Sequence, residues 1–165
     1  MDFSNQVVDD FINLYASIGY VALKWSYTEQ ATDMACSIVF HQCGGKTTVE
    51  KRLPKFTRDK NKFLVKAIEK LPELSGFAPQ VNDVTGRIAK LMDIRHDFIH
   101  SVLTDLKHSS AGVFKFQRLD TSELIHRGKE WKFDVKDFPK LSVQLEALAK
   151  DSLKLTRALV ERFCK

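Results

Sequence analysis

The sequence predicts an all-α fold, a helical bundle of four to five helices with a small β-hairpin inserted before the C-terminal helix. Apolar residues recur at helical spacing over most of the chain, and the period becomes alternating only between about residues 114 and 135. Clusters of glycine and proline separate the periodic segments. No internal repeat or low-complexity tract interrupts the 165 residues, so we expect a single domain over residues 1–165.

The first helical pattern covers residues 3–42. It fits two helices, or one helix bent at Gly19, because glycine weakens a helix interior by about 1 kcal/mol relative to alanine. Gly44-Gly45 is expected to end this segment. The apolar positions are Val7, Phe11, Leu14, Tyr15, Ile18, Val21, Trp25, Cys36 and Val39.

A connecting loop is predicted over residues 44–56, where two glycines and Pro54 occur. A shorter helix should follow from about Thr57 to Leu71, before Pro72, Gly76 and Pro79 break the chain again. Its expected buried face consists of Phe63, Leu64, Ala67, Ile68 and Leu71.

The central helix is predicted from about Pro79 to Lys107. Arg95 falls on its apolar stripe, where a charged side chain is costly unless a partner compensates it. This position makes Arg95 a better site candidate than a surface arginine. The stripe consists of Val81, Val84, Ile88, Leu91, Phe98 and Val102.

Alternating aromatic residues after Gly112 predict a small antiparallel hairpin, with its turn near Asp120-Thr121 or near Gly128-Lys129. Asp137 and Pro139 are expected at the start of the last helix. The inward-facing residues of that helix should be Leu141, Leu145, Leu148, Leu155, Leu159 and Phe163.

The bulk composition favours a cytoplasmic protein. The N-terminus lacks the basic start and apolar run of a secretory signal, and no apolar stretch is long enough for a membrane span. Cys36, Cys43 and Cys164 are odd in number, which favours free thiols, and a zinc site of Cys36, His41 and Cys43 matches no standard spacing. The net charge of +5 helps binding to a polyanion and permits an RNA substrate.

Arg95 and His100 combine the two capacities that metal-free RNA cleavage needs. Arginine holds phosphate with a planar fork, and histidine exchanges a proton near pH 7. Positions five apart on a helix differ by about 140° and about 7.5 Å, so the two residues are not expected to meet on one undistorted helix. A homodimer in which two copies of this helix meet would supply the missing partner.

The stretch Arg95-His96-Asp97-Phe98-Ile99-His100 resembles the HEPN superfamily, whose ribonuclease members carry an arginine, a polar residue after it, and a histidine four to six residues beyond the arginine. A long helix that carries this motif and a β excursion before a closing helix are also similar to the family. His96 stands where asparagine is commoner.

The resemblance implies a metal-independent endoribonuclease that acts as a homodimer, in a toxin or phage-defence setting with an antitoxin or other regulatory protein as partner. His100 of one protomer would take the proton of the RNA 2′-hydroxyl, and His100 of the other would protonate the leaving oxygen. Arg95 would hold the phosphate, and His96 would orient either group or contact the RNA backbone. No metal and no other cofactor is predicted. The alternative is a non-catalytic module of the same fold that binds RNA, a nucleotide or a protein.

Several other roles compete for these residues. Arg95 could instead form a structural pair with Glu29, which could equally hold it in a useful orientation. Asp93, His96 and His100 lie on one side of the helix and could ligate zinc, although Asp97 stands where a His-Glu-x-x-His motif requires glutamate. Asp97 is expected near the solvent or in support of a neighbouring histidine.

A basic run with interleaved aromatic residues follows the first helix. It is a candidate RNA-binding surface, chiefly through Lys51, Arg52, Lys55 and Arg58, although a solvated loop and helix face is the more frequent explanation of such a run. Lys60 and Lys62 continue the run, and Phe56 and Phe63 are the aromatic residues within it.

Overall fold

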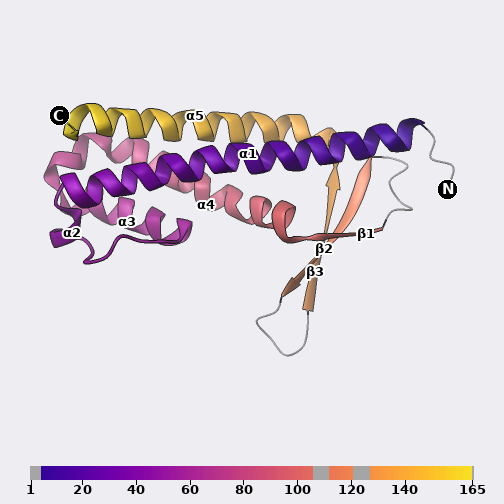
Figure 1. The fold of residues 1–165 in the computed structure, drawn as a ribbon, viewed down its shortest axis with the longest axis horizontal. Helices are drawn as coiled ribbons and strands as arrows, with labels where there is room; N and C mark the ends of the chain where they lie inside the picture. Colours follow the sequence, from indigo (N-terminus) through magenta and orange to yellow (C-terminus); the bar gives the residue numbers. More distant parts are fainter. Residues whose placement is uncertain (1–4, 106–111, 121–126, 165) are drawn as a thin grey trace. The chain divides into compact units, whose positions relative to one another are not determined.

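The computed structural model describes residues 5–105, 112–120 and 127–164. These residues form five α-helices and a small antiparallel sheet that precedes the last helix (Figure 1), which confirms the predicted mostly helical fold. In chain order the elements are α1 (Asn5–Gln42), α2 (Gly45–Thr48), α3 (Thr57–Lys70), the 3₁₀ helix η1 (Pro72–Phe77), α4 (Ala78–His100), β1 (Val102–Asp105), β2 (Val113–Asp120), β3 (Arg127–Asp134), the 3₁₀ helix η3 (Val135–Asp137) and α5 (Phe138–Phe163).

The first segment is one helix rather than two, and α3 ends within one residue of its predicted end. The predicted loop after α1 contains one short helix, α2, whose entry depends on two glycines. Gly44 adopts a left-handed φ of 75°, and a Cβ on Gly45 would lie 2.7 Å from the Val39 carbonyl oxygen. The tight turn at this point therefore requires glycine at both positions.

The predicted end of the central helix is wrong. Helix α4 ends at His100 rather than Lys107, and Val102–Asp105 forms strand β1. The stripe residues from Val81 to Phe98 are buried as predicted, but Val102 is 62% exposed. Val102 and Thr104 are β-branched, and strand pairing with β2 satisfies the backbone groups that the helix would have used.

The sheet therefore has three antiparallel strands in the order β1-β2-β3 rather than a hairpin alone. Phe114 lies opposite Phe133 and Phe116 opposite Trp131, and the last pair stacks with ring centroids 4.5 Å apart. Gly128 and Lys129 lie inside β3, so a turn there is wrong. Asp120 ends β2, and Thr121 lies outside the described residues.

The chain divides into two compact units, one of residues 1–23 and 93–145 and the other of residues 24–92 and 146–165. Aromatic contacts hold the first unit, where Phe114 meets Phe11 at 5.2 Å and Phe98 meets Phe133 at 4.8 Å. In the second unit Thr156 donates a hydrogen bond to the Ala31 carbonyl. The fully buried large side chains of the second unit include Trp25, Phe63, Leu64, Leu74, Ile88, Leu148 and Leu159.

The last helix confirms its predicted inward face, because Leu141, Leu145, Leu148, Leu155 and Leu159 are buried. Phe163 is partly exposed and contacts Phe77. Asp137 directly precedes α5, but the carboxylate that accepts a backbone N–H in this turn is Asp134, from Lys136. Over the stretches that the structure covers, no helix has the length and apolarity that crossing a bilayer would require.

Candidate active site

Arg95 and His100 meet within one chain, so the expectation that they could not do so is wrong. The Nη1 atom of Arg95 lies 3.4 Å from Nε2 of His100. Positions five apart still diverge around the axis, but the long arginine side chain spans the gap, and His100 is the last residue of α4. A guanidinium can only donate, so Nε2 of His100 is the acceptor in this contact.

His96 lies beside this pair, with its ring centroid 4.5 Å from that of His100. Partial burial lowers the pKa of His96, and the positive charges of His100, Arg118 and Arg95 lower it further, against an opposing effect of Asp97. His96 is therefore mainly neutral near pH 7 and can accept a hydrogen bond or a proton. Both imidazoles are exposed to solvent.

Asp97 is buried, which corrects its expected place near the solvent. Its Oδ1 accepts from Arg118 Nη1 at 2.6 Å, and its Oδ2 accepts from Lys129 Nζ at 2.8 Å. Arg118 and Lys129 lie opposite each other on β2 and β3, where two like charges repel. The carboxylate of Asp97 offsets that repulsion and fixes the end of α4 to the sheet.

The α4-end cluster comprises Arg95, His96, Asp97, His100, Arg118 and Lys129. Its permanent charges are three cations against one carboxylate, so the cluster has an excess of positive charge when the histidines are neutral. An exposed site of this kind attracts a phosphodiester and offers imidazole groups to it.

Glu29, the predicted partner of Arg95, accepts a hydrogen bond from Thr57 Oγ1 at 3.0 Å in the second unit. Arg95 belongs to the first unit, so its pairing with Glu29 stays a prediction.

The predicted RNA-binding residues are all exposed and lie in the loop before α3 and in the first turn of that helix; they are Lys51, Arg52, Lys55 and Arg58. Phe56 among them is 73% exposed, whereas Phe63 is fully buried and belongs to the core. Lys60 forms an ion pair with Asp33. One aromatic ring, rather than two, thus accompanies the basic side chains.

Neither proposed set of metal ligands comes together in the structure. Across the residues placed by the structure, no three His, Cys, Asp or Glu side chains form a group that could hold a metal ion. This result excludes the set of Asp93 and the two histidines of α4 as well as the set of Cys36, His41 and Cys43. The cysteines are free, and burial raises the pKa of Cys36 to about 12 and that of Cys43 to about 11.

The sequence pattern predicted Arg95 and His100 as candidates, which the structure brings into contact, but it did not point to the residues around Asp97. Arg118 and Lys129 lie 21 and 32 residues from Asp97 in the chain, and only the register of β2 and β3 brings them to it. Ser101, whose hydroxyl accepts a hydrogen bond from Trp131 Nε1 at 2.8 Å, was also missed. No protein-family model, curated protein or solved structure matches this chain.

Proposed function

We propose that this chain is a metal-independent endoribonuclease that acts in the cytoplasm as a homodimer. The observation that carries the proposal is the contact between Arg95 and His100, 3.4 Å apart at an exposed end of α4 with an excess of positive charge. A guanidinium and an imidazole at this separation can contact the phosphate and the neighbouring 2′-hydroxyl of one nucleotide together. The resemblance of residues 95–100 to the HEPN motif supports the same chemistry.

The proposed reaction is an internal transfer of the phosphodiester. His100 removes the proton from the 2′-hydroxyl, and the resulting oxygen attacks the adjacent phosphorus while the bond to the 5′-oxygen breaks. Arg95 holds the non-bridging oxygens as negative charge develops on them. The products are a 2′,3′-cyclic phosphate and a 5′-hydroxyl, and no water or metal enters this step.

A homodimer is proposed because the departing 5′-oxygen needs a proton from a second group. His100 of the second copy would donate it while the first His100 accepts one. His96, which burial and neighbouring cations keep mainly neutral, lies beside His100 and supports it by accepting a hydrogen bond. Asp97 supports the site by forming ion pairs with Arg118 and Lys129.

RNA binding is proposed for the exposed basic run of Lys51, Arg52, Lys55 and Arg58. Lysine and arginine side chains bind the phosphate backbone, and an exposed ring such as that of Phe56 can stack on an unpaired base. These residues favour single-stranded RNA as the substrate. A toxin or phage-defence setting, with an antitoxin as partner, is part of the proposal through the HEPN resemblance alone.

The decisive experiment is an RNA cleavage assay with the purified chain in excess chelator. Cleavage should persist, leave 2′,3′-cyclic phosphate ends, and be lost in both Arg95→Ala and His100→Ala while circular dichroism shows that the variants fold. Lys150→Ala, an exposed change on α5, is the matched control and should cleave normally. Loss of cleavage on chelation would contradict the mechanism, and RNA binding without cleavage by the unchanged chain would favour the non-catalytic module.

A further inference from the structure

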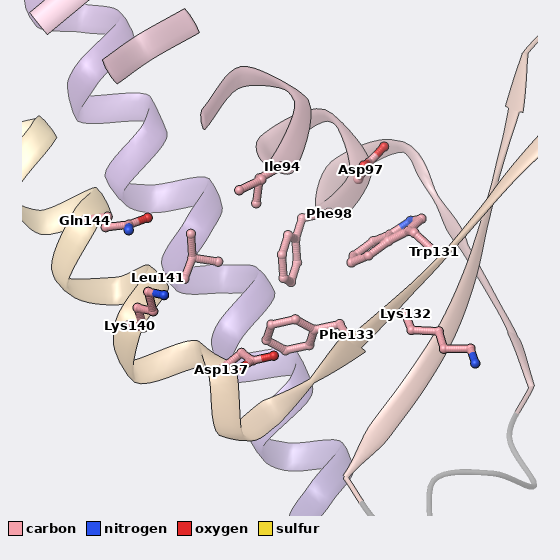
Figure 2. A pocket seen from close by; sticks show the side chains of 10 residues that line it. All are labelled: Ile94, Asp97, Phe98, Trp131, Lys132, Phe133, Asp137, Lys140, Leu141 and Gln144. Atoms are coloured by element: carbon pink, nitrogen blue, oxygen red, sulfur yellow. The ribbon is translucent and has the colours of Figure 1, made fainter. Parts of the chain in front are cut away.

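A pocket of about 480 Å³ lies within the first unit, between the end of α4, strand β3 and the start of α5. Its volume is within the range of small-molecule sites. Figure 2 shows the side chains that line it, which are Ile94, Asp97, Phe98, Trp131, Lys132, Phe133, Asp137, Lys140, Leu141 and Gln144.

Three aromatic rings form one side of this pocket. Phe98 meets Trp131 edge to face at 5.2 Å and Phe133 at 4.8 Å, and Figure 2 shows the three rings grouped together. The indole of Trp131 is fixed by stacking on Phe116 and by its hydrogen bond to Ser101. A flat apolar ligand would therefore find a rigid surface that loses little conformational freedom on binding.

The polar residues of the pocket lie on η3 and α5. Lys140 and Gln144 are four residues apart on α5 and therefore share one helix face, Asp137 directly precedes that helix, and all three are exposed. They offer a carboxylate, an ammonium group and an amide. Lys132 points away from the three rings in Figure 2, and Lys140 is the other cation among the lining residues.

The pocket adjoins the α4-end cluster through two links. Asp97 lines the pocket and also holds Arg118 and Lys129 of the cluster. Ser101, which anchors the Trp131 ring, is the residue directly after His100. The lining of the pocket is therefore connected to the residues of the proposed reaction site.

We propose that this pocket binds the base of a nucleotide next to the phosphodiester that is cut. Aromatic rings suit the faces of a base, the carboxylate and amide suit its hydrogen-bonding edge, and Lys140 suits its phosphate. The inference rests on the proposed ribonuclease function and adds to it a recognition site for one base.

Binding of single nucleotides tests the pocket without any cleavage, because a nucleoside 5′-monophosphate has no phosphodiester to cut. The unchanged chain is titrated with each of the four ribonucleoside 5′-monophosphates and with ribose 5-phosphate, while tryptophan emission and calorimetry are recorded. At least one nucleotide should bind about tenfold more tightly than ribose 5-phosphate, as expected for one base on an aromatic surface. The emission change should vanish in Trp131→Phe, because the other tryptophan, Trp25, is buried in the second unit.

Two exposed changes avoid the risk of unfolding that truncation of Trp131 carries. Lys140→Ala and Gln144→Ala should each weaken nucleotide binding several-fold, whereas Lys150→Ala on the same helix should not. Equal affinity for ribose 5-phosphate and all nucleotides, or unchanged affinity in both pocket variants, would overturn the pocket even if RNA is cleaved. Selective nucleotide binding by a chain that cuts no RNA would support the pocket and overturn the ribonuclease.

Discussion

Arg87 and Arg95 lie on the same helix, α4, but their surroundings differ. Arg87 forms ion pairs with two carboxylates, those of Asp83 and of Asp151, the latter at 2.9 Å. Arg95 contacts the imidazole of His100, and within the described ranges no ion pair to a carboxylate is found for it. The first arginine is neutralised by the protein, whereas the charge of the second remains available to a phosphate.

The pKa of Asp151 reflects the structural role of Arg87. Burial, the largest single effect, would raise the pKa of Asp151, but hydrogen bonds and charges from Arg87 and Lys154 together lower it. Exposed pairs of this kind contribute only about 0–1 kcal/mol each, so Arg87 is a modest stabilising residue. Among the residues that the structure describes, Arg95 forms no comparable ion pair.

The largest expected effect separates the two arginines. Arg95→Ala should lower the rate of RNA cleavage about 100- to 1000-fold, because it removes the donor that faces the developing charge, and should leave the melting temperature nearly unchanged. Arg87→Ala should do the reverse, with a loss of stability of about 1 kcal/mol and normal cleavage. Single-turnover kinetics and thermal denaturation of both variants measure the contrast.

Arg95→Lys refines this comparison, because it keeps the charge but loses the planar fork. Cleavage between that of the unchanged chain and that of Arg95→Ala would assign part of the effect to paired hydrogen bonds. If Arg95→Ala instead lowered stability as much as Arg87→Ala and left cleavage intact, the distinction between the two arginines would be wrong.

The second prediction concerns the proposed homodimer. The unchanged chain is refolded together with about a ninefold excess of His100→Ala. If each site needs His100 from both copies, about nine in ten unchanged chains then pair with an inactive copy. The activity per unchanged chain should therefore fall roughly tenfold. Arg87→Ala in the same excess is the control, and should not inhibit. Activity that stays proportional to the amount of unchanged chain would show that one protomer suffices.

An effect of similar size, on RNA affinity rather than on the reaction rate, is expected at the basic run. Phe56→Ala should weaken binding of single-stranded RNA about tenfold, because a stacked base contributes about 1–3 kcal/mol. Tyr15, which is 64% exposed on α1 and has no basic run beside it, gives the matched control Tyr15→Ala. Fluorescence anisotropy at several salt concentrations measures both variants, and equal affinity for them would exclude Phe56 as a stacking residue.

Local pattern was enough to predict most of the helices. The apolar spacing of α3 and the proline directly after Leu71 set that helix to within one residue. The end of α4 could not be predicted in this way, because Val102 continues the apolar spacing of the helix. Its strand conformation depends on pairing with Gln117, a contact that sequence periodicity does not contain.

The same limit applies to the site. Arg95 and His100 could be chosen from their motif, but their contact within one chain could not, since helix geometry alone separates them. The cations that surround Asp97 come from two strands whose register depends on the whole sheet. Two cations that face each other on neighbouring strands, such as Arg118 and Lys129, indicate that a carboxylate lies between them. This signal could be used only if the register of the hairpin were known.

The smallest effect concerns the pH dependence of stability. Because the pKa of His96 is lowered in the folded chain, the unfolded chain binds a proton there first as the pH falls, so stability should decrease from about pH 7 downward through the ordinary histidine pKa near 6.5 and below. His96→Gln removes this titration and should flatten that part of the profile in urea denaturation. Steeper acid destabilisation in His96→Gln than in the unchanged chain would contradict the lowered pKa of His96. The supporting role proposed for His96 would then fail too, because it requires a neutral imidazole.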